Sequence, residues 1–563
     1  MKLEKPCRQN LLGLAFFAIF AVPSAACAAP AVVTQMYNNA HTSWNPNETR
    51  LTVANVKASF HLLFTDATDG QTYAQPLYIP HLRMGRLGTH NVIFVATENN
   101  TVYAFDADQA GSPLWSQNLT PNGETLQTSA DYNNTRVPQI GITGTPVIDL
   151  ERHAIYAIAA SKTLNSPVVF HQRLHSLDLA TGNELPHSPV DIQAKYPGTG
   201  GLQDGSGNVV FDPLSHFNRA ALLLFDNNIY VAFGSHEDTG IYQGWVMAYN
   251  KTSLAQVAVI NTSPNLPTGV SGGSVWQSSI GLVADTNSVY AITANGPFDV
   301  NTGGVDYGDT ALRLTSKLGV ADYFTPCNQQ ALNDNDIDLG SGAVMILPNQ
   351  AGKLSHLATF SGKEGTIYLV NRSAMGGYTP TEVPDNVECT DNVVQELWRV
   401  LGTDPTDTSN RIDFYGAPAY FKDSSGHQYI YYSGNYAPII AYNLDKEIMT
   451  PGTVACGAPN QTPPSTYNFP NGGTIPSISS NGGNPATAIL WAIKRAASTD
   501  GYGALTLDAF AATDLTNQLV FDIPAGQWNY HNYAFLIPTV VNGKVYVSSG
   551  GELDVFGVNA PTR

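Results

Sequence analysis

The chain has 563 residues, of which 43% are hydrophobic and 13% charged, and its formal net charge is −18. It contains no run of Lys and Arg, so the electrostatic footprint of a nucleic-acid-binding protein is missing and we expect no nucleic-acid partner. Gly, Pro and Tyr are plentiful (50, 35 and 27 residues), which favours many short strands joined by turns over helices or disorder.

The first 28 residues have the pattern of an export signal. Basic residues precede an apolar run at residues 11–22, and small residues follow at 24–29. Cleavage after Ala28 satisfies the Ala-x-Ala preference, and lipidation at Cys27 is the alternative. No other apolar run approaches the ~18 residues that span a bilayer, so we expect no transmembrane segment. The pattern predicts a mature protein that is periplasmic or secreted.

One strand pair recurs along the chain. Residues 91–108, NVIFVATENNTVYAFDAD, predict two strands at 92–97 and 101–106 joined by an Asn-rich turn. Seven variants follow, the last being KVYVSSGGELDVFGV. Phe94 and Tyr546 are equivalent points in the first and eighth copies, which gives a period of about 65 residues. The repeats predict an all-β, eight-bladed β-propeller of four-stranded antiparallel blades.

The two ends of the propeller are expected to meet. Residues 29–50 are rich in Asn, Thr and Pro and predict an irregular N-terminal arm, and the propeller then extends over residues 51–563. A strand at 59–64 has no partner nearby in the sequence, and the eighth repeat is one strand short. We therefore expect the early strand to complete the last blade and to remove a free sheet edge.

Three cysteines remain after cleavage. One disulfide is permitted in an oxidising compartment, and Cys389 and Cys456 are the favoured pair because both lie in long loops, which leaves Cys327 odd. None of the three begins a Cys-x-x-Cys-His motif, which excludes an attached haem, and the lack of a Cys-x-x-Cys pair argues against structural zinc.

Several segments together resemble a known family. YAQPLYIP, THNVIFVATENNTVYAFDAD, IGITGTPVID, LHSLDLATG and PTVVNGKVYVSSG are similar to the pyrroloquinoline quinone (PQQ) repeat proteins. Those proteins are eight-bladed propellers of the quinoprotein alcohol dehydrogenase-like type, and the resemblance spans about residues 45–560. Dehydrogenase members of the family hold PQQ and Ca²⁺ over the centre of the ring. In those members two adjacent cysteines lie against the quinone, a Trp lies beneath it, Glu and Asn bind the metal, and an Asp is catalytic. This chain has no adjacent cysteines, and no catalytic residue is carried over by match.

Candidate residues are sought where the inner strands and their loops converge on the central channel. His236 follows a strand of the third blade, beside Glu237 and Asp238, and a general base or metal ligand is one interpretation. An ordinary polar loop is the other. Asp306 is the second candidate catalytic residue, in the glycine-rich loop of the fourth blade.

Four residues are candidates for binding a cofactor. Trp276 and Asn295 could join Asp306 as the stacking, carboxamide and carboxylate groups that a quinone–calcium site requires. Arg219 lies at a strand start, and Lys363 lies in a hairpin turn where it could meet an anionic ligand. The alternatives are turn-stabilising residues and an exposed hairpin lysine.

Three alternating carboxylates form the candidate metal site. Asp334, Asp336 and Asp338 offer oxygen ligands to a hard cation such as Ca²⁺. A complete EF-hand is excluded because Leu339 and Met345 stand where that loop requires Gly and Glu. A partial calcium site and a plain acidic turn remain.

Two functions from different classes fit this sequence. The first is an exported propeller that binds a small-molecule ligand or a protein partner, or acts as a scaffold. The alternative, which the family resemblance implies, is a PQQ- and Ca²⁺-dependent dehydrogenase of alcohols or sugars that passes electrons to a separate carrier.

Overall fold

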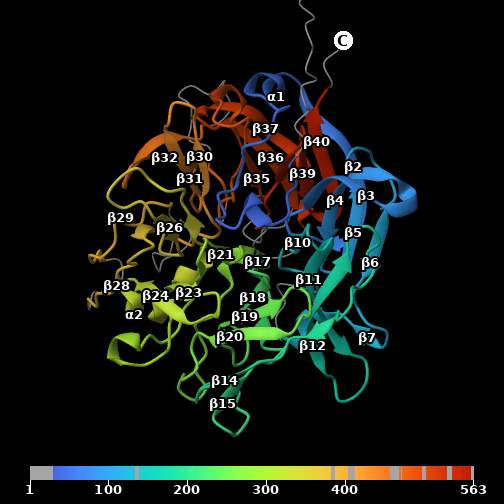
Figure 1. Ribbon diagram of the computed structural model, residues 1–563. Coiled ribbons are helices and arrows are strands. Elements are labelled where there is room, and N and C mark those ends of the chain that lie inside the picture. The colour runs from blue at the N-terminus through green and yellow to red at the C-terminus, as the bar shows by residue number, and fades with distance from the viewer. Residues whose placement is uncertain are drawn as a thin grey trace, which may run out of the picture.

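The computed structural model describes residues 30–132, 138–236, 238–381, 387–402, 412–456, 468–470, 472–496, 503–528 and 535–559. Within these residues the chain forms eight sheets of four or five strands, arranged around a central axis in sequence order (Figure 1). The predicted eight-bladed β-propeller is thus confirmed.

The first four blades follow the predicted repeats. Their strands are β3 (Leu77–Arg83), β4 (Thr89–Ala96), β5 (Thr101–Asp106) and β6 (Trp115–Asn118); β10 (Val147–Asp149), β11 (Ala154–Thr163), β12 (Phe170–Asp178) and β13 (Val190–Asp191), with β7 (Glu124–Thr125) beside β11; β16 (His216–Phe217), β17 (Leu223–Phe225), β18 (Asn228–Ser235), β19 (Trp245–Asn250) and β20 (Gln256–Asn261); and β21 (Val283–Ala284), β22 (Ser288–Ile292), β23 (Ala311–Thr315) and β24 (Val320–Thr325).

The last four blades complete the circle. Their strands are β25 (Met345–Ile346), β26 (Leu357–Ser361), β27 (Ile367–Asn371) and β29 (Gln395–Leu397); β30 (Ala419–Lys422), β31 (Gln428–Ser433), β32 (Ile439–Asp445) and β33 (Ile448–Val454); β34 (Ser477–Ser479), β35 (Ile489–Lys494), β36 (Gly503–Ala511) and β37 (Asp514–Trp528), with β1 (Trp44–Asn45) beside β34; and β38 (Thr539–Val541), β39 (Lys544–Ser548) and β40 (Gly550–Val558), with β2 (Phe60–Gln71) beside β40.

Apolar side chains between neighbouring blades hold the ring together. The middle strands are buried on both faces, as in β18, and their β-branched and aromatic residues suit a sheet covered on each side. One such cluster packs Val231 and Trp245 of the third blade against Tyr156 of the second. Each blade therefore depends on its neighbour for burial, which explains why the repeats form a closed array rather than separate lobes.

The early strand closes the ring as predicted. β2 runs antiparallel to β40, with Phe60 opposite Val558 and Asp66 opposite Leu553. The strand is longer than the expected residues 59–64. It follows the short helix α1 (Val53–Ser59), whose first turn is capped by Thr52 and Asn55.

The N-terminal arm passes along the innermost strands. It makes at least one hydrogen bond with each blade: Val32 with Tyr78, Val33 with Ile148, Asn39 with Leu224 and Ala284, Ala40 with Ile346, Thr42 with Tyr420, Ser43 with Ile478, and Tyr37 with Val540. The inner edge of a blade exposes unpaired backbone groups, and these contacts satisfy part of that edge. The arm thus connects all eight blades.

The remaining elements lie in the loops. They are two small hairpins, β8 (Gln127–Thr128) with β9 (Gln139–Ile140) and β14 (Lys195–Pro197) with β15 (Asn208–Val210); the helix α2 (Gln329–Asp334); and the 3-10 turns η1 (Gln35–Tyr37), η2 (Gly85–Leu87), η3 (Ser129–Asp131), η4 (Gln277–Ser279), η5 (Val300–Thr302), η6 (Leu339–Ser341) and η7 (Pro485–Thr487). None of the described helices has the length and apolar character needed to cross a bilayer.

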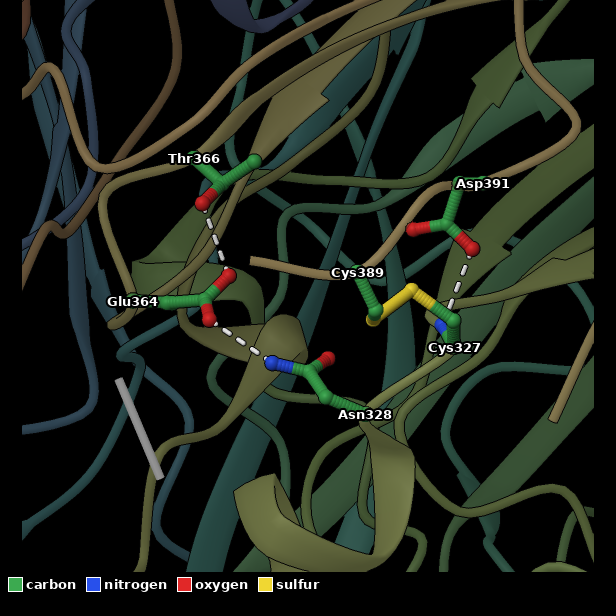
Figure 2. The surroundings of a disulfide bond; sticks show 6 residues. All are labelled: Cys327, Asn328, Glu364, Thr366, Cys389 and Asp391. Carbon is green, nitrogen blue, oxygen red and sulfur yellow. Dashed lines mark hydrogen bonds between the residues drawn. A yellow bond between two sulfur atoms is a disulfide. The ribbon is translucent and has the colours of Figure 1, made fainter. Parts of the chain in front are cut away.

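The favoured disulfide pairing is wrong. Cys327 is bonded to Cys389 (Figure 2). Cys456 is a half-buried free thiol. After β27, the long insert turns back onto the fourth blade, where β28 (Gly377–Tyr378) runs parallel to β24. This pairing brings the Cα atom of Cys389 to 6.2 Å from that of Cys327. The prediction rested on the length of the loops that carry the cysteines, and loop length does not show which loops lie close together.

Candidate functional site

Most of the candidate residues lie on one face of the ring. Successive strands of an antiparallel blade run in opposite directions. The loop between the second and third strands therefore lies at the same end of the blade as the loop that leads into the first strand. The first kind of loop carries Glu98, His236, Asn295, Asp306, Asp309 and Lys363, and the second kind carries Arg219, Trp276, Asp336 and Asp338. We call this side the loop face.

Four residues of the loop face form an acid–lysine cluster, which consists of Asn295, Asp336, Asp338 and Lys363. The Asn295 backbone N–H donates to Asp338 Oδ1 (2.9 Å), and Asn295 Nδ2 donates to Asp336 Oδ1 (3.0 Å). Lys363 Nζ lies 3.1 Å from Asp336 Oδ1 and 2.5 Å from Asp338 Oδ2. Two carboxylates, an amide and an ammonium thus come together from the fourth and fifth blades and the loop between them.

The two carboxylates of this cluster differ in how much of each side chain is exposed to solvent. The side chains of Asp338 and Lys363 are 10% and 8% exposed, whereas that of Asp336 is 52% exposed. Asn295 Oδ1 is buried and has no hydrogen-bond partner in the described part of the chain. Asp336 is therefore the carboxylate that a molecule from solvent can reach, and Asn295 has an acceptor still available.

Two glycines permit the loops of the cluster to approach this closely. A Cβ atom on Gly340 would lie 2.6 Å from the Ala294 nitrogen, and one on Gly362 would lie 2.6 Å from the Leu339 Cα atom. Backbone atoms occupy both positions, so any larger residue would push the blades apart. The glycines next to the acidic loop and the lysine turn therefore help to set the geometry of the cluster.

Asp309 supports the acidic loop from within. It is fully buried, and its Oδ1 accepts the backbone N–H of Leu339 (3.0 Å). Burial raises the pKa of Asp309 well above its ordinary value, and the nearby charge of Asp338 raises it further. Asp309 thus fixes the backbone that follows Asp338 and does not face the acid–lysine cluster as a free base.

His236 belongs to a stacked aromatic group rather than to an acid–base pair. Its ring lies between those of Tyr132 and Phe217, with centroid distances of 3.8 and 4.3 Å. Burial lowers the pKa of His236 well below its ordinary value, and the charge of Arg219 lowers it further, so the imidazole is neutral. Its neighbour Glu237 lies outside the described residues.

Arg219 and Trp276 are in contact. The guanidinium carbon of Arg219 lies 5.0 Å from the centre of the half-buried indole and 5.9 Å from the ring of Phe217. These distances are those of cation–π interactions. The contact places a positive charge and a flat aromatic surface side by side on the loop face.

Glu98 is a functional candidate that the sequence analysis missed. It is fully buried, and its carboxylate accepts hydrogen bonds from the Gly141 N–H (2.7 Å) and the Thr143 hydroxyl (2.7 Å). Burial raises the pKa of Glu98 to about 7, although the charge of Arg219 lowers it in part. A signal was available, since Glu98 follows the second strand of its blade as Lys363 does.

The third blade lies close enough to influence this region electrostatically. The hydroxyl of Tyr242 donates to Asp238 Oδ1 (2.6 Å). Burial raises the pKa of Tyr242 strongly, and the charges of Asp238, Asp338 and Asp336 raise it further. The loop after His236 therefore lies close enough to Asp336 and Asp338 for their charges to act on it.

Asp306 and Asp334 lie apart from the acid–lysine cluster. Asp306 is buried and accepts the N–H of Asn265 (2.9 Å), and burial raises its pKa. Asp334 ends α2 on an exposed surface, where Gln330 Nε2 donates to its carboxylate (2.8 Å). Among the described residues, no three His, Cys, Asp or Glu side chains gather in an arrangement that could hold a metal ion. Of the three alternating carboxylates, the structure thus brings Asp336 and Asp338 together with Asn295, and it leaves Asp334 outside the cluster.

Comparisons with known proteins give the fold alone. No protein-family model matches the chain, and no curated protein matches it in sequence. Among solved structures, it is similar to a quinohemoprotein alcohol dehydrogenase from Pseudomonas putida, with a TM-score of 0.58 and 12% identity over 95% of this chain and 81% of that one. It is also similar to a europium-containing methanol dehydrogenase, with a TM-score of 0.55 and 13% identity over 94% of this chain and 98% of that one.

Proposed function

We propose that the loop face binds a flat, carboxylate-bearing ligand of the PQQ kind together with a hard cation such as Ca²⁺. We further propose that the protein uses them to oxidise alcohols or sugars outside the cytoplasm. The observation that supports this best is the convergence of Asn295, Asp336 and Asp338 around Lys363.

The donor set of this cluster suits a hard cation. Ca²⁺ takes carboxylate and amide oxygens as ligands, and Asp336, Asp338 and Asn295 supply both kinds. Asn295 Oδ1 is buried without a hydrogen-bond partner in the described chain, as expected for an oxygen that serves an external ligand. These three residues would hold the cation.

The neighbouring residues suit a flat, anionic ligand. The indole of Trp276 can stack on a planar ring system, and Arg219 beside it can form bidentate hydrogen bonds with a carboxylate. Lys363, in the fifth blade, carries a second positive charge on the loop face. The positive charge of Arg219 on the loop face favours an anion there.

The roles of the residues follow from their exposure. PQQ, when bound, supplies a two-electron acceptor for the oxidation. Asp336 is half exposed and can accept the hydroxyl proton of an alcohol, while Lys363 holds the carboxylate in place. This assigns the proton-accepting role to Asp336 rather than to Asp306 or His236, which are both buried away from the cluster.

Two further features agree with this proposal. The fold is shared with two proteins that are described as alcohol or methanol dehydrogenases. The signal-like first 28 residues, which lie outside the described part, support export to the periplasm or secretion.

Reconstitution tests the proposal. The purified protein is mixed with PQQ and Ca²⁺, its bound chromophore is recorded by absorbance, and dye reduction is followed with a panel of alcohols and sugars. Asp336→Asn is expected to abolish dye reduction, because the exposed carboxylate is lost. Asp334→Asn is the matched control, because it removes a carboxylate two residues away that lies outside the cluster, and it should behave like the wild type. The proposal fails if no chromophore is retained.

A binding protein without turnover is the second candidate function. One observation favours it: Lys363 already forms ion pairs with both carboxylates, so each has a counter-ion without a bound metal. The same experiment separates the two functions. A retained chromophore with no dye reduction across the panel would support ligand binding alone.

A further inference from the structure

The disulfide bond lies directly before the helix α2, which is followed by Asp336 and Asp338 of the acid–lysine cluster. Cys327 precedes α2 by two positions, and α2 ends two residues before Asp336. On its other side the bond holds Cys389 of the insert that follows β27. The disulfide therefore fixes the start of the segment whose end carries Asp336 and Asp338.

Hydrogen bonds on both sides tie this cystine into the protein. Asp391 Oδ1 accepts the backbone N–H of Cys327 (2.9 Å), as Figure 2 shows, and the backbone carbonyl of Cys327 accepts the N–H of Thr381 (3.1 Å). Cys327 is buried, with 2% of its surface exposed. The insert and the start of α2 therefore behave as one unit while the bond is intact.

A second connection runs from the cystine to the lysine. Asn328, the residue after Cys327, donates through Nδ2 to Glu364 Oε1 (2.8 Å), and the hydroxyl of Thr366 donates to Glu364 Oε2 (2.7 Å) (Figure 2). Glu364 is buried and is the immediate neighbour of Lys363. The cystine thus reaches both partners of the ion pair: the carboxylates through α2, and the lysine through Asn328 and Glu364.

We propose that the Cys327–Cys389 disulfide is the positioning element of the acid–lysine cluster, so that its reduction weakens cation binding at Asn295, Asp336 and Asp338. This inference rests on the proposed cation site. Reduction by a dithiol breaks the sulfur–sulfur bond and transfers two electrons and two protons to the cysteines, and the dithiol becomes a cyclic disulfide. The insert can then separate from α2, and the carboxylates lose the fixed spacing that a cation requires.

The surroundings of the disulfide favour such a separation once the bond is broken. Burial raises the pKa of Asp391, in the insert, to about 7 and that of Glu396, in the following strand β29, to about 8. Exclusion from water favours the neutral form of each of these carboxyl groups. Water that entered beside the free thiols would allow them to ionise, which opposes reburial of the insert.

Calorimetric titration with Ca²⁺ and with La³⁺ tests this inference on the full chain. The oxidised protein is compared with the protein reduced by dithiothreitol and with the Cys327→Ser/Cys389→Ser variant. We expect both altered forms to bind the cation about tenfold more weakly or worse, as is usual when the support of a metal site is removed. Reoxidation of the reduced wild type should restore the original affinity, which also covers the case in which the double variant does not fold.

Two variants separate positioning from general stability. Asn328→Ala keeps the disulfide but breaks the link to Glu364, and it should lower cation affinity in the oxidised protein. Cys456→Ser removes the free thiol and should bind as the wild type does in both redox states.

The possible failures are distinguishable. If reduction lowers the melting temperature and leaves cation affinity unchanged, the disulfide is a stabilising link alone and this inference is wrong. If neither Ca²⁺ nor La³⁺ binds to the oxidised protein, the proposed cation site itself is wrong, and the inference falls with it.

Discussion

Lys363 Nζ lies 2.5 Å from Asp338 Oδ2, and both side chains are about nine-tenths buried. Asp338 lies in the loop that leads from the fourth blade into the fifth, and Lys363 follows β26 in the fifth blade. A buried ammonium that lacks its partner is costly, and so is a buried carboxylate. This pair therefore ties the loop that enters the fifth blade to the turn after β26 and holds the proposed site in its observed form.

The first prediction concerns this ion pair. Lys363→Met keeps most of the apolar stem but leaves the buried carboxylate of Asp338 without its cation, so we expect a loss of about 3 kcal/mol in the free energy of unfolding. Urea denaturation followed by circular dichroism measures it. Lys195→Met is the control, because the Lys195 side chain is 62% exposed in its pair with Asp204 and should change stability little. Equal losses in the two variants would contradict the role of burial.

The second prediction concerns the pH dependence that Glu98 causes. Its pKa is raised from 4.5 to about 7 by burial, so the folded state binds the proton more tightly than the unfolded state does. The contribution of Glu98 to stability is therefore fully present below pH 4.5, is lost as the pH rises towards 7, and no longer changes well above that value. The contribution is on the order of 3 kcal/mol.

Glu98→Gln tests this directly. The amide cannot ionise, so the fall in stability between pH 4.5 and 7 should become smaller by the contribution of Glu98. Unfolding free energies at closely spaced pH values measure the difference between the two proteins. Parallel curves for the wild type and the variant would show that Glu98 does not titrate in this range.

The third prediction concerns the N-terminal arm. The hydroxyl of Tyr37 accepts the backbone N–H of Val540 (2.8 Å) and is bonded to Ser477 Oγ (2.9 Å), so it connects the arm to the seventh and eighth blades. Tyr37→Phe leaves the Val540 N–H without this partner and should cost about 1–3 kcal/mol of unfolding free energy. Thermal and urea unfolding measure the loss.

A matched control for the arm is Ser477→Ala. It removes one partner of the Tyr37 hydroxyl but leaves the bond from Val540 intact. We expect a smaller loss than for Tyr37→Phe. If Tyr37→Phe is neutral, the arm does not contribute to ring stability through this residue.

The fourth prediction concerns the cysteines. Mass spectrometry of a non-reduced digest should find the Cys327–Cys389 peptide pair and a free thiol at Cys456. Because the bond closes a loop with a sequence separation of 62 residues, its loss in Cys389→Ser should cost about 4 kcal/mol by the loop-entropy estimate. Recovery of a Cys389–Cys456 peptide instead would overturn the observed pairing.

Local sequence determined the blades and their order. Phe94 and Tyr546 mark equivalent positions because each blade must present the same buried strand to its neighbours, and that requirement repeats the same residue types. The closing strand was also predictable, since β2 and the short eighth repeat each lacked a partner. The arm's contacts with all eight blades were not, because its residues carry no periodic pattern.

The candidate site was only partly predictable, because contacts between loops follow no periodic pattern in the sequence. Sequence patterns grouped Asn295 with Trp276 and Asp306, grouped Asp336 and Asp338 with Asp334, and pointed to Lys363 by itself. Only the tertiary structure brought these four together, left Asp334 outside, buried Glu98 and paired Cys327 with Cys389. Strand periodicity is a local property that short segments encode. Which loops meet depends on how the blades are rotated about a shared axis, and that arrangement arises from packing between residues far apart in the chain.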